Sequence, residues 1–447
     1  MSSENGQGLA DKTMGSSLKA LNWIAGSQIL DKLKIRSQFE RTIFQSTKHG
    51  MRAATNAGRT FKKASSIGKP ARQKSGGGSG LFDLTPDEEQ KMFIEAGQAF
   101  AAAEIRPAAA TADAEKATPS GILAQANELG INTLGIPEEF DGVLGDQSAV
   151  TWVLIAEALA HGDLGVAYAT LAPGAVATAI GRWGDEVQQS TYLPAFTGEN
   201  PPAAALAILE PRPLFDPFTL ETRAVPADDG GWILNGSKSL VSRPGECEIF
   251  VIAAATGEGE NALFIVESGT SGLEFEPEPA MGLRAASTGR ITLTDVRLPA
   301  EAVIGEASER PGIYSDCVAG SRIAWAGLTT GTSQAVLDYV IPYVNERHAF
   351  GEPVSNRQSV AFSVSDIAIE TGGFRLVTYR AASRSDRGES FSREAGLARK
   401  LAADKGMEIG STGVQLLGGH GYVKEHPVER WYRDLRAAGV MEGALLA

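Results

Sequence analysis

Hydrophobic positions divide the chain into helical, sheet-forming and again helical stretches. From 81 to about 199 they recur with helical spacing. Thr85, followed by a proline and then a glutamate three residues after the threonine, predicts a helix with Thr85 as its N-cap. The Ala-rich apolar run 149–180 predicts a buried pair of helices joined at Gly162-Asp163.

After Pro201 the pattern changes to short runs rich in β-branched residues, such as "CEIFVIAAAT" and "GRITLTDVRLP", which predict an antiparallel sheet. Helical spacing returns near Gly312 and continues in two long runs at about 358–384 and 391–416. The pattern therefore predicts an α+β multidomain protein. Its expected parts are an arm with a Gly/Ser linker over 1–80, an N-terminal helical domain over 81–200, a middle antiparallel β domain over 201–306 and a C-terminal helical domain, a four-helix bundle, over 307–447.

Charge separates the arm from the remainder of the 447 residues. Residues 1–74 hold 14 Lys/Arg and 4 Asp/Glu, whereas the rest holds 27 Lys/Arg and 50 Asp/Glu. A nucleic-acid partner is not expected, because an acidic body repels phosphates.

The arm, residues 16–74, alternates apolar residues with lysines and arginines at roughly helical spacing. Such a basic amphipathic helix can lie on an anionic membrane surface. A disordered or subunit-packing tail gives the same pattern, and a mitochondrial transit peptide has the same composition. We expect a cytoplasmic protein with membrane contact through this arm, and the mitochondrial matrix is the alternative.

Cysteine and histidine spacing argues against a metal or redox centre. Cys247 and Cys317 lie far apart, and the five histidines include no pair at the spacing of helical metal ligands. We expect free thiols in a reducing compartment and no metal. An apolar run long enough to span a membrane, about twenty residues, is not expected.

Three local features invite a chemical interpretation, and each also has a structural one. The glycines of "GGHGYVKEHPVERWYRD" (418–434) are typical of a helix end followed by a loop. Arg347 is compatible with a solvated cation at a helix C-terminus. Glu442 in "VMEGALLA" is compatible with a surface carboxylate near the chain end.

Their combination and order are more specific. An α–β–α chain with "MGLRAASTGRITLTDVRLPAEAVIGE", "ERHAFGEPVSNRQSV", "GVQLLGGHGYVKEHPVERWYRD" and "MEG" resembles the acyl-CoA dehydrogenase family. The resemblance runs from about Leu81 to the end and excludes the arm.

The resemblance implies FAD as cofactor. Glycine permits close backbone approach to a phosphate, and arginine offers forked donors. The family's Arg and Phe of the ERxxFG stretch, its adenine-end Gln, and the Gln and glycines of QxxGG hold the FAD of a neighbouring subunit; the matching positions here are Arg347, Phe350, Gln358, Gln415, Gly418 and Gly419.

The resemblance also implies the catalytic base. Glu442 matches the family's EG carboxylate, which removes a proton from the α-carbon of an acyl thioester while a hydride moves to the flavin. Arg322 matches an arginine that lines the substrate site. Some members carry the base just before that arginine, but Ser321 stands there, so Glu442 is the candidate. The chain ends five residues later, either as a short natural variant or as a truncated sequence.

The middle domain departs from the family pattern. "LEPRPLFD" (209–216) replaces TEPGAGSD, placing Leu209 for a flavin-contacting Thr and Phe215 for a Ser near the thioester, where it is expected to narrow the substrate channel. The flavin-covering Trp-x-Thr becomes Leu240-Val241-Ser242, which keeps only the hydroxyl of Ser242 for the cofactor.

These features lead to three hypotheses. The first is α,β-dehydrogenation of an acyl-CoA in fatty-acid or related catabolism, with electrons passed to an electron-transfer flavoprotein, by a homotetramer or homodimer. The second is a non-catalytic or half-site subunit that completes the FAD site of a related partner in a heteromer. The third is an altered reaction or donor, such as an acyl-carrier-protein thioester, an oxidase or a bulky acyl group.

Overall fold

The computed structural model describes residues 85–143 and 147–447, and the arm lies outside them. The first helix that the structure describes has Asp87, and not Thr85, as its N-cap. The Asp87 carboxylate accepts from the Gln90 backbone N–H at 2.8 Å, and the Gln90 side chain accepts from the Asp87 N–H at 3.1 Å. This reciprocal capping box selects Asp87 as the N-cap, because it satisfies two free N–H groups at once.

The N-terminal domain is helical, as predicted. Its α-helices are α4 (Glu88–Phe100), α5 (Arg106–Glu115), α6 (Ser120–Glu128), α7 (Ala149–Gly162), α8 (Leu164–Trp183) and α9 (Glu186–Thr197), with short turns η1 (Ala101–Ile105), η2 (Ile131–Thr133) and η3 (Glu138–Phe140) between them.

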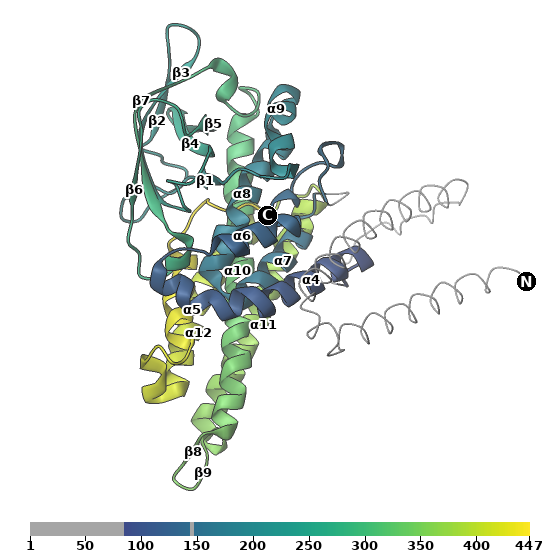
Figure 1. Cartoon of the computed structure of the whole chain (residues 1–447), viewed down its shortest axis with the longest axis vertical. Coiled ribbons are helices and arrows are strands. Elements are labelled where there is room, and N and C mark those ends of the chain that lie inside the picture. The colour runs from purple at the N-terminus through teal and green to yellow at the C-terminus, as the bar shows by residue number, and fades with distance from the viewer. Residues whose placement is uncertain (1–84, 144–146) are drawn as a thin grey trace, which may run out of the picture. The chain divides into compact units, whose positions relative to one another are not determined.

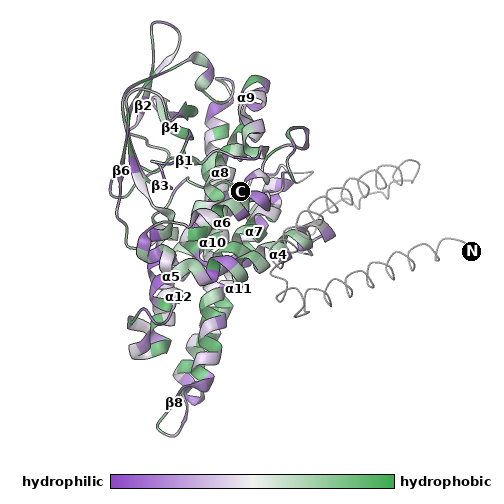
Figure 2. Ribbon diagram, in the orientation of Figure 1, coloured by the Kyte–Doolittle hydropathy of each residue, from purple (hydrophilic) through white to green (hydrophobic). Residues whose placement is uncertain are grey.

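The predicted helix pair is present, and Asp163 joins it as the N-cap of α8. Helix α8 is long and apolar enough to cross a membrane, contrary to the expectation from sequence, but 94% of its most apolar window is buried inside the protein. Figure 2 shows the apolar colouring of α8 beside α10. Alanines and glycines let α8 pack closely on all sides, which is typical of a core helix.

The middle domain contains a seven-stranded sheet in the order β1-β4-β2-β3-β7-β6, with β5 paired to β4. It is not wholly antiparallel, because β1 runs parallel to β4 with Ala204 opposite Ile249, and β2 also meets β4 in parallel. Strand β1, "AALA", escaped prediction because it contains no β-branched residue. The strands are β1 (Ala204–Ala207), β2 (Arg223–Pro226), β3 (Trp232–Val241), β4 (Ile249–Gly257), β5 (Glu260–Glu267), β6 (Leu273–Pro277) and β7 (Gly289–Leu298), with turns η4 (Arg284–Ala286) and η5 (Ala300–Ala302).

The C-terminal domain is built from long helices (Figure 1). The two predicted runs at 358–384 and 391–416 are α11 and α12, correct to within two residues at each end. The elements are α10 (Arg310–Glu346), the hairpin β8 (His348–Ala349) and β9 (Glu352–Pro353), η6 (Val354–Asn356), α11 (Gln358–Asp386), α12 (Ser392–Leu417), η7 (Gly418–Tyr422), α13 (Val428–Leu435) and η8 (Arg436–Gly439).

Helix α13 forms hydrogen bonds and ion pairs with residues of both other domains. Arg433 makes two hydrogen bonds to Asp113 of α5, at 2.8 and 3.0 Å. Arg430 pairs with the buried Asp163 at 2.8 Å. The Asp434 carboxylate accepts from the backbone N–H of Leu283 in the middle domain at 2.7 Å, and burial raises the pKa of Asp434 to about 8. One short helix therefore fastens all three domains together.

Candidate active site

Glu442 lies in the interior and not on the surface, with 3% of the residue exposed. It follows η8, and its carboxylate faces the side chains of α10 and α12. Arg322 of α10 donates from Nη2 to Oε1 at 3.1 Å and from Nε to Oε2 at 3.3 Å. Arg399 of α12 places its Nε 2.6 Å from the same Oε1. The structure thus joins two residues predicted from sequence, Glu442 and Arg322, and adds Arg399.

The backbone next to Glu442 is also held on several sides. The Gly443 carbonyl accepts from the hydroxyl of Ser321 at 2.9 Å and from the indole N–H of Trp325 at 2.8 Å. Gly443 has φ 74°, and a Cβ there would lie 2.5 Å from Ile208, so only glycine fits. In the sequence, Ser321 stands where some family members carry the catalytic carboxylate. In the structure, its hydroxyl helps to position the backbone next to Glu442.

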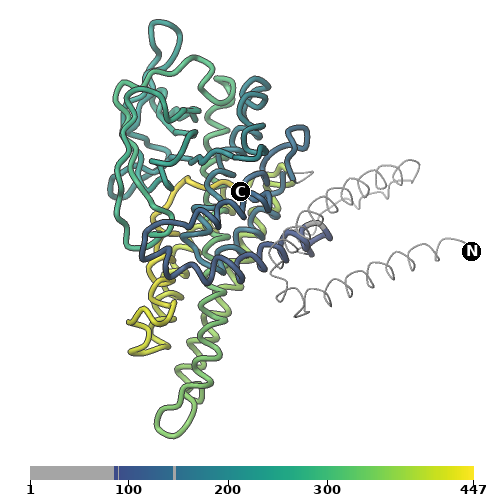
Figure 3. Tube along the Cα trace, viewed as in Figure 1, coloured from purple at the N-terminus to yellow at the C-terminus, as the bar shows by residue number. Residues whose placement is uncertain are grey.

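The residues after Glu442 are buried as well, from Gly443 to Ala447. Figure 3 shows this end of the trace, labelled C, returning to the middle of the helices. The Ala447 carbonyl accepts from Arg182 of α8 at 3.0 Å, and its N–H donates to the Gly320 carbonyl at 3.4 Å. This segment fixes the position of Glu442 from its C-terminal side.

A cavity of about 600 Å³ opens where the end of α10, the start of α11 and the end of α12 meet. Gly418 has φ 57° and ψ −131°, a conformation that is essentially restricted to glycine. No atom lies within 4 Å of a Cβ built on Gly419, so the backbone there is open. Four of the residues predicted to hold a cofactor line this cavity, namely Arg347, Gln415, Gly418 and Gly419, together with Tyr343, Arg357, Ser359, Ser363 and His420 among others.

The other two residues of the C-terminal domain predicted to hold the cofactor, Gln358 and Phe350, lie next to residues that line this cavity. Gln358 is the first residue of α11. Phe350, in the β8–β9 hairpin, is 95% exposed, and the Arg357 guanidinium lies 5.2 Å from its ring centroid. An exposed aromatic side chain at this position is available to a second molecule.

The two middle-domain residues predicted at the site, Ser242 and Phe215, have contacts of their own. Ser242 is buried, and its hydroxyl donates to the Ala286 carbonyl at 3.4 Å. The loop after it, Arg243 to Glu246, lines a second cavity of about 400 Å³. Phe215 packs against the two core clusters that contain Leu445 and Leu446, and the Arg212 guanidinium lies 5.3 Å from its ring centroid.

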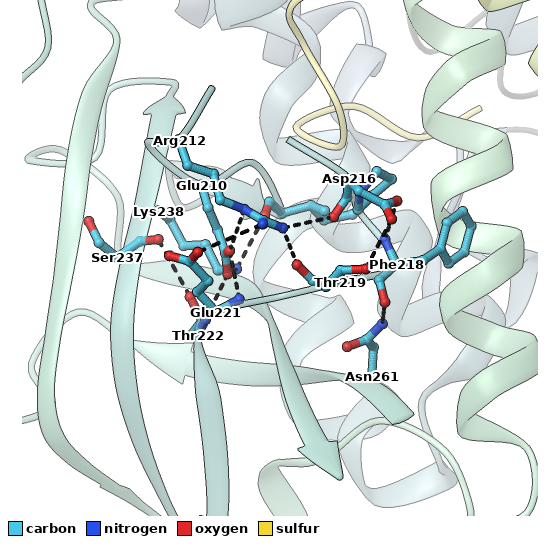
Figure 4. Close-up of polar contacts among 12 residues, drawn as sticks. Glu210, Arg212, Asp216, Phe218, Thr219, Glu221, Thr222, Ser237, Lys238 and Asn261 are labelled. Carbon is cyan, nitrogen blue, oxygen red and sulfur yellow. Dashed lines mark hydrogen bonds and ion pairs between the residues drawn. The ribbon is translucent and has the colours of Figure 1, made fainter. Parts of the chain in front are cut away.

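The altered stretch "LEPRPLFD" surrounds a buried ion pair (Figure 4). The Lys238 Nζ lies 3.0 Å from Oε1 of Glu210. The backbone N–H of Thr222 donates to the same Oε1 and that of Glu221 to Oε2, at 2.8 Å each. Burial lowers the pKa of Lys238 to about 8, against the attraction of Glu210. Burial alone would raise the pKa of Glu210, but Lys238 and the two backbone donors bring it below its ordinary value. This cluster fixes the loop that carries Phe215.

Sequence reasoning missed Arg399, Trp325 and Lys238. Each contacts a partner on another element, and Arg399 lies 43 residues before Glu442 in the chain. Trp325 lies four residues after Ser321, so the two side chains share one face of α10. That spacing beside Arg322 was the available signal for Trp325. Within the described residues, no group of three or more His, Cys, Asp or Glu is arranged to hold a metal, and both cysteines are buried free thiols.

Comparison with known proteins identifies the family. Three family models match in order: acyl-CoA dehydrogenase N-terminal domain over residues 87–199, middle domain over 205–296 and C-terminal domain over 313–445.

Relatives agree with these models. The probable acyl-CoA dehydrogenase YngJ of Bacillus subtilis is 32% identical over 371 residues, covering 81% of this chain and 96% of that protein. The mitochondrial short-chain specific acyl-CoA dehydrogenase of Rattus norvegicus is 31% identical over 366 residues, covering 80% and 87%. The structure of butyryl-CoA dehydrogenase from Megasphaera elsdenii superposes with a TM-score of 0.74 at 28% identity, covering 81% of this chain and 96% of that one.

These matches confirm the predicted three-domain fold. They also confirm the prediction that the protein is an oxidoreductase with FAD as its cofactor. The chain belongs to the acyl-CoA dehydrogenase family.

Proposed function

We propose that this protein introduces an α,β double bond into an acyl-CoA thioester, with Glu442 as the base, and passes the electrons to an electron-transfer flavoprotein. The observation that carries the proposal is the environment of Glu442. Its carboxylate is buried, contacts Arg322 and Arg399, and is followed by a backbone carbonyl fixed by Ser321 and Trp325. A carboxylate held in this way has a defined position toward a substrate, which general base catalysis requires.

The chemistry divides between the protein and the cofactor. Glu442 accepts the proton from the carbon next to the thioester, so that a C–H bond breaks and an O–H bond forms at the carboxylate. Bound FAD supplies the acceptor for the hydride from the β-carbon. The carboxylate must be ionised to accept the proton.

The cavity between α10, α11 and α12 fits the phosphates and adenosine of FAD. Arg347 and Arg357 both line it, and guanidinium groups bind phosphate oxygens with paired donors. Gly418 and Gly419 leave their backbone accessible there. Toward the flavin ring the fit is poorer, because the Ser242 hydroxyl already donates to Ala286 and Leu240 stands for the family's aromatic cover.

We propose a homodimer or homotetramer in which this cavity serves the FAD of a neighbouring subunit. The support is an apolar row on α11: Phe362, Ile369 and Leu376 recur every seven residues and are 57%, 68% and 51% exposed. Residues at this spacing lie on one side of a helix, and large exposed apolar groups in a row are typical of an interface. Phe350, 95% exposed, lies at the tip of the same helical region (Figure 1).

The experiment uses the purified full chain. We expect a flavin absorbance spectrum, its bleaching by acyl-CoA without oxygen, and reoxidation by an electron-transfer flavoprotein. Sedimentation of the same sample is expected to give a dimer or tetramer, and a flavin-loaded monomer would contradict the assembly. Chain length is read from a series of saturated acyl-CoA thioesters.

Other results would favour the alternative functions. Flavin that binds only after co-expression with a related subunit would replace the proposal by the half-site subunit. Bleaching by an acyl-carrier-protein thioester but not by acyl-CoA would change the donor, and rapid reoxidation by oxygen would indicate an oxidase.

We also propose that the protein is cytoplasmic and that residues 16–74, which lie outside the described residues, contact anionic membranes. The support is their excess of basic over acidic residues, which attracts anionic lipid. The full chain is expected to bind phosphatidylserine vesicles less as salt rises, and a chain starting at Leu81 to bind much less. Equal binding of the two chains to the vesicles would contradict the membrane contact. Recovery of the protein in the mitochondrial matrix fraction of the cell would contradict the cytoplasmic location.

A further inference from the structure

Two arginines share one oxygen of Glu442. Arg322 Nη2 lies 3.1 Å from Oε1, and Arg399 Nε lies 2.6 Å from the same atom. The second oxygen, Oε2, receives only the Arg322 Nε at 3.3 Å. Neither the family resemblance nor the proposed reaction assigns a role to Arg399.

Arg399 also contacts the backbone that leads to Glu442. Its Nη2 donates to the Gly439 carbonyl, the last residue of η8, at 3.5 Å. One side chain of α12 therefore touches both the turn before Glu442 and the carboxylate itself. Its Nε–H has no hydrogen-bond acceptor, so the contact of Arg399 with Glu442 is electrostatic.

The charge balance around Glu442 favours the anion. The two guanidinium side chains are 23% and 25% exposed, and the Glu442 side chain is 4% exposed. Opposite charges within about 4 Å stabilise the ionised carboxylate. Burial lowers the pKa of Arg399 from its ordinary value, although Glu442 opposes that change.

The remaining titratable groups that interact with this site leave that balance unchanged. From α10, Tyr314 and Cys317 are buried, and burial raises the pKa of both above the ordinary value, so both stay neutral. From the middle domain, Phe218 covers Arg322, with the guanidinium carbon 5.9 Å from the ring centroid. Glu210 and Asp216 act on Tyr314, but Glu210 is paired with Lys238 and the Asp216 carboxylate accepts from the Phe218 N–H and the Thr219 hydroxyl.

We propose that Arg399 is a positioning residue for the base: together with Arg322 it holds the Glu442 carboxylate ionised between turnovers and sets the pH below which the reaction stops. This inference rests on the proposed function. When Glu442 accepts the α-proton it becomes neutral, and the electron pair of the broken C–H bond forms the α,β double bond as the hydride leaves the β-carbon. The two guanidinium groups then lose their counter-charge, so the carboxyl group returns its proton to solvent and ionises again before the next substrate.

The test compares Arg399→Gln, which removes the charge, with Arg399→Lys, which keeps it. The rate of anaerobic flavin bleaching is measured as a function of pH in single turnovers. We expect the wild-type rate to rise to a plateau, and the rise in Arg399→Gln to occur about 1 pH unit higher, because one stabilising cation is gone. Below the wild-type rise, the variant is then about tenfold slower, whereas the plateau rate is not reduced. Arg399→Lys is expected to restore the wild-type profile.

A matched control and a direct measurement accompany this profile. Arg393→Gln removes an exposed arginine from the same helix and is expected to leave the profile unchanged. The ionisation of Glu442 is also read without substrate, from the carboxylate infrared band that is present in wild type and absent in Glu442→Gln. Its midpoint is expected to move upward in Arg399→Gln.

Two results would overturn the inference. A lower plateau with an unchanged pH profile would indicate that Arg399 has only a structural role, and an unchanged infrared midpoint would show that Arg399 does not stabilise the anion. If wild type fails to bleach, the proposed function fails, but the infrared titration still decides the role of Arg399.

Discussion

Glu442→Gln is expected to slow substrate-dependent bleaching of the flavin by about 10³-fold, within the range that removal of a general base produces. Glutamine has nearly the same shape and can keep contact with Arg322, but it cannot accept the α-proton. The flavin spectrum before substrate is expected to match that of wild type, because Glu442 lines neither of the two cavities described above.

The control for Glu442→Gln is Glu425→Gln, which removes an exposed carboxylate from the loop before α13. Both variants lose one negative charge, so only the position differs. Bleaching of Glu442→Gln at the wild-type rate would reject Glu442 as the base. Glu442→Asp, with a shorter side chain, is expected to retain a pH-dependent residual rate, since it still ionises.

The second large effect is on stability. Lys238→Met is expected to lower the free energy of unfolding by about 3 kcal/mol or more, because breaking a buried pair leaves an uncompensated charge. Lys238 is fully buried, and its ammonium group lies 3.0 Å from Glu210 and 3.2 Å from the Ile208 carbonyl. Without it, Glu210 keeps only the more distant Arg212, whose Nε lies 3.7 Å from Oε2, or takes up a proton.

Chemical denaturation of the full chain measures this loss. Adding Glu210→Gln to Lys238→Met is expected to recover part of it, because the buried carboxylate that lost its nearest cation is then removed as well. Lys91→Met, which removes an exposed lysine paired with Glu88 on the surface, is the matched control and is expected to unfold close to wild type. A double variant as unstable as the single one would place the cost in packing and not in charge.

The sequence predicted some helices and strands more closely than others, for physical reasons. Helices α11 and α12 were placed closely because their apolar residues keep helical spacing over 29 and 26 residues. Strand β1 was not found, because three alanines and one leucine, all buried, leave no alternation to detect. The first N-cap was misplaced by two residues, since Thr85 and Asp87 are both suitable caps and only the partner Gln90 separates them.

The candidate site shows the same division. Glu442, Arg322 and the glycines at 418 and 419 were predicted because short motifs name them. The contact between Arg399 and Glu442 depends on how α12 packs beside η8, and no local pattern records that packing. Family membership does not reveal it either, since it is a property of side chains in this chain.

The bonds of α13 have a consequence for synthesis on the ribosome. Arg433, the partner of Asp113, lies 320 residues further along the chain. Arg430, the partner of Asp163, lies 267 residues further along. At a synthesis rate of about 5–20 residues per second, Arg433 is added roughly 15–60 s after Asp113. During that interval Asp113 and Asp163, which the finished protein buries, lack the arginines to which they are hydrogen-bonded. The nascent N-terminal half is therefore expected to depend on chaperones until the last helix emerges and completes the folding of all three domains.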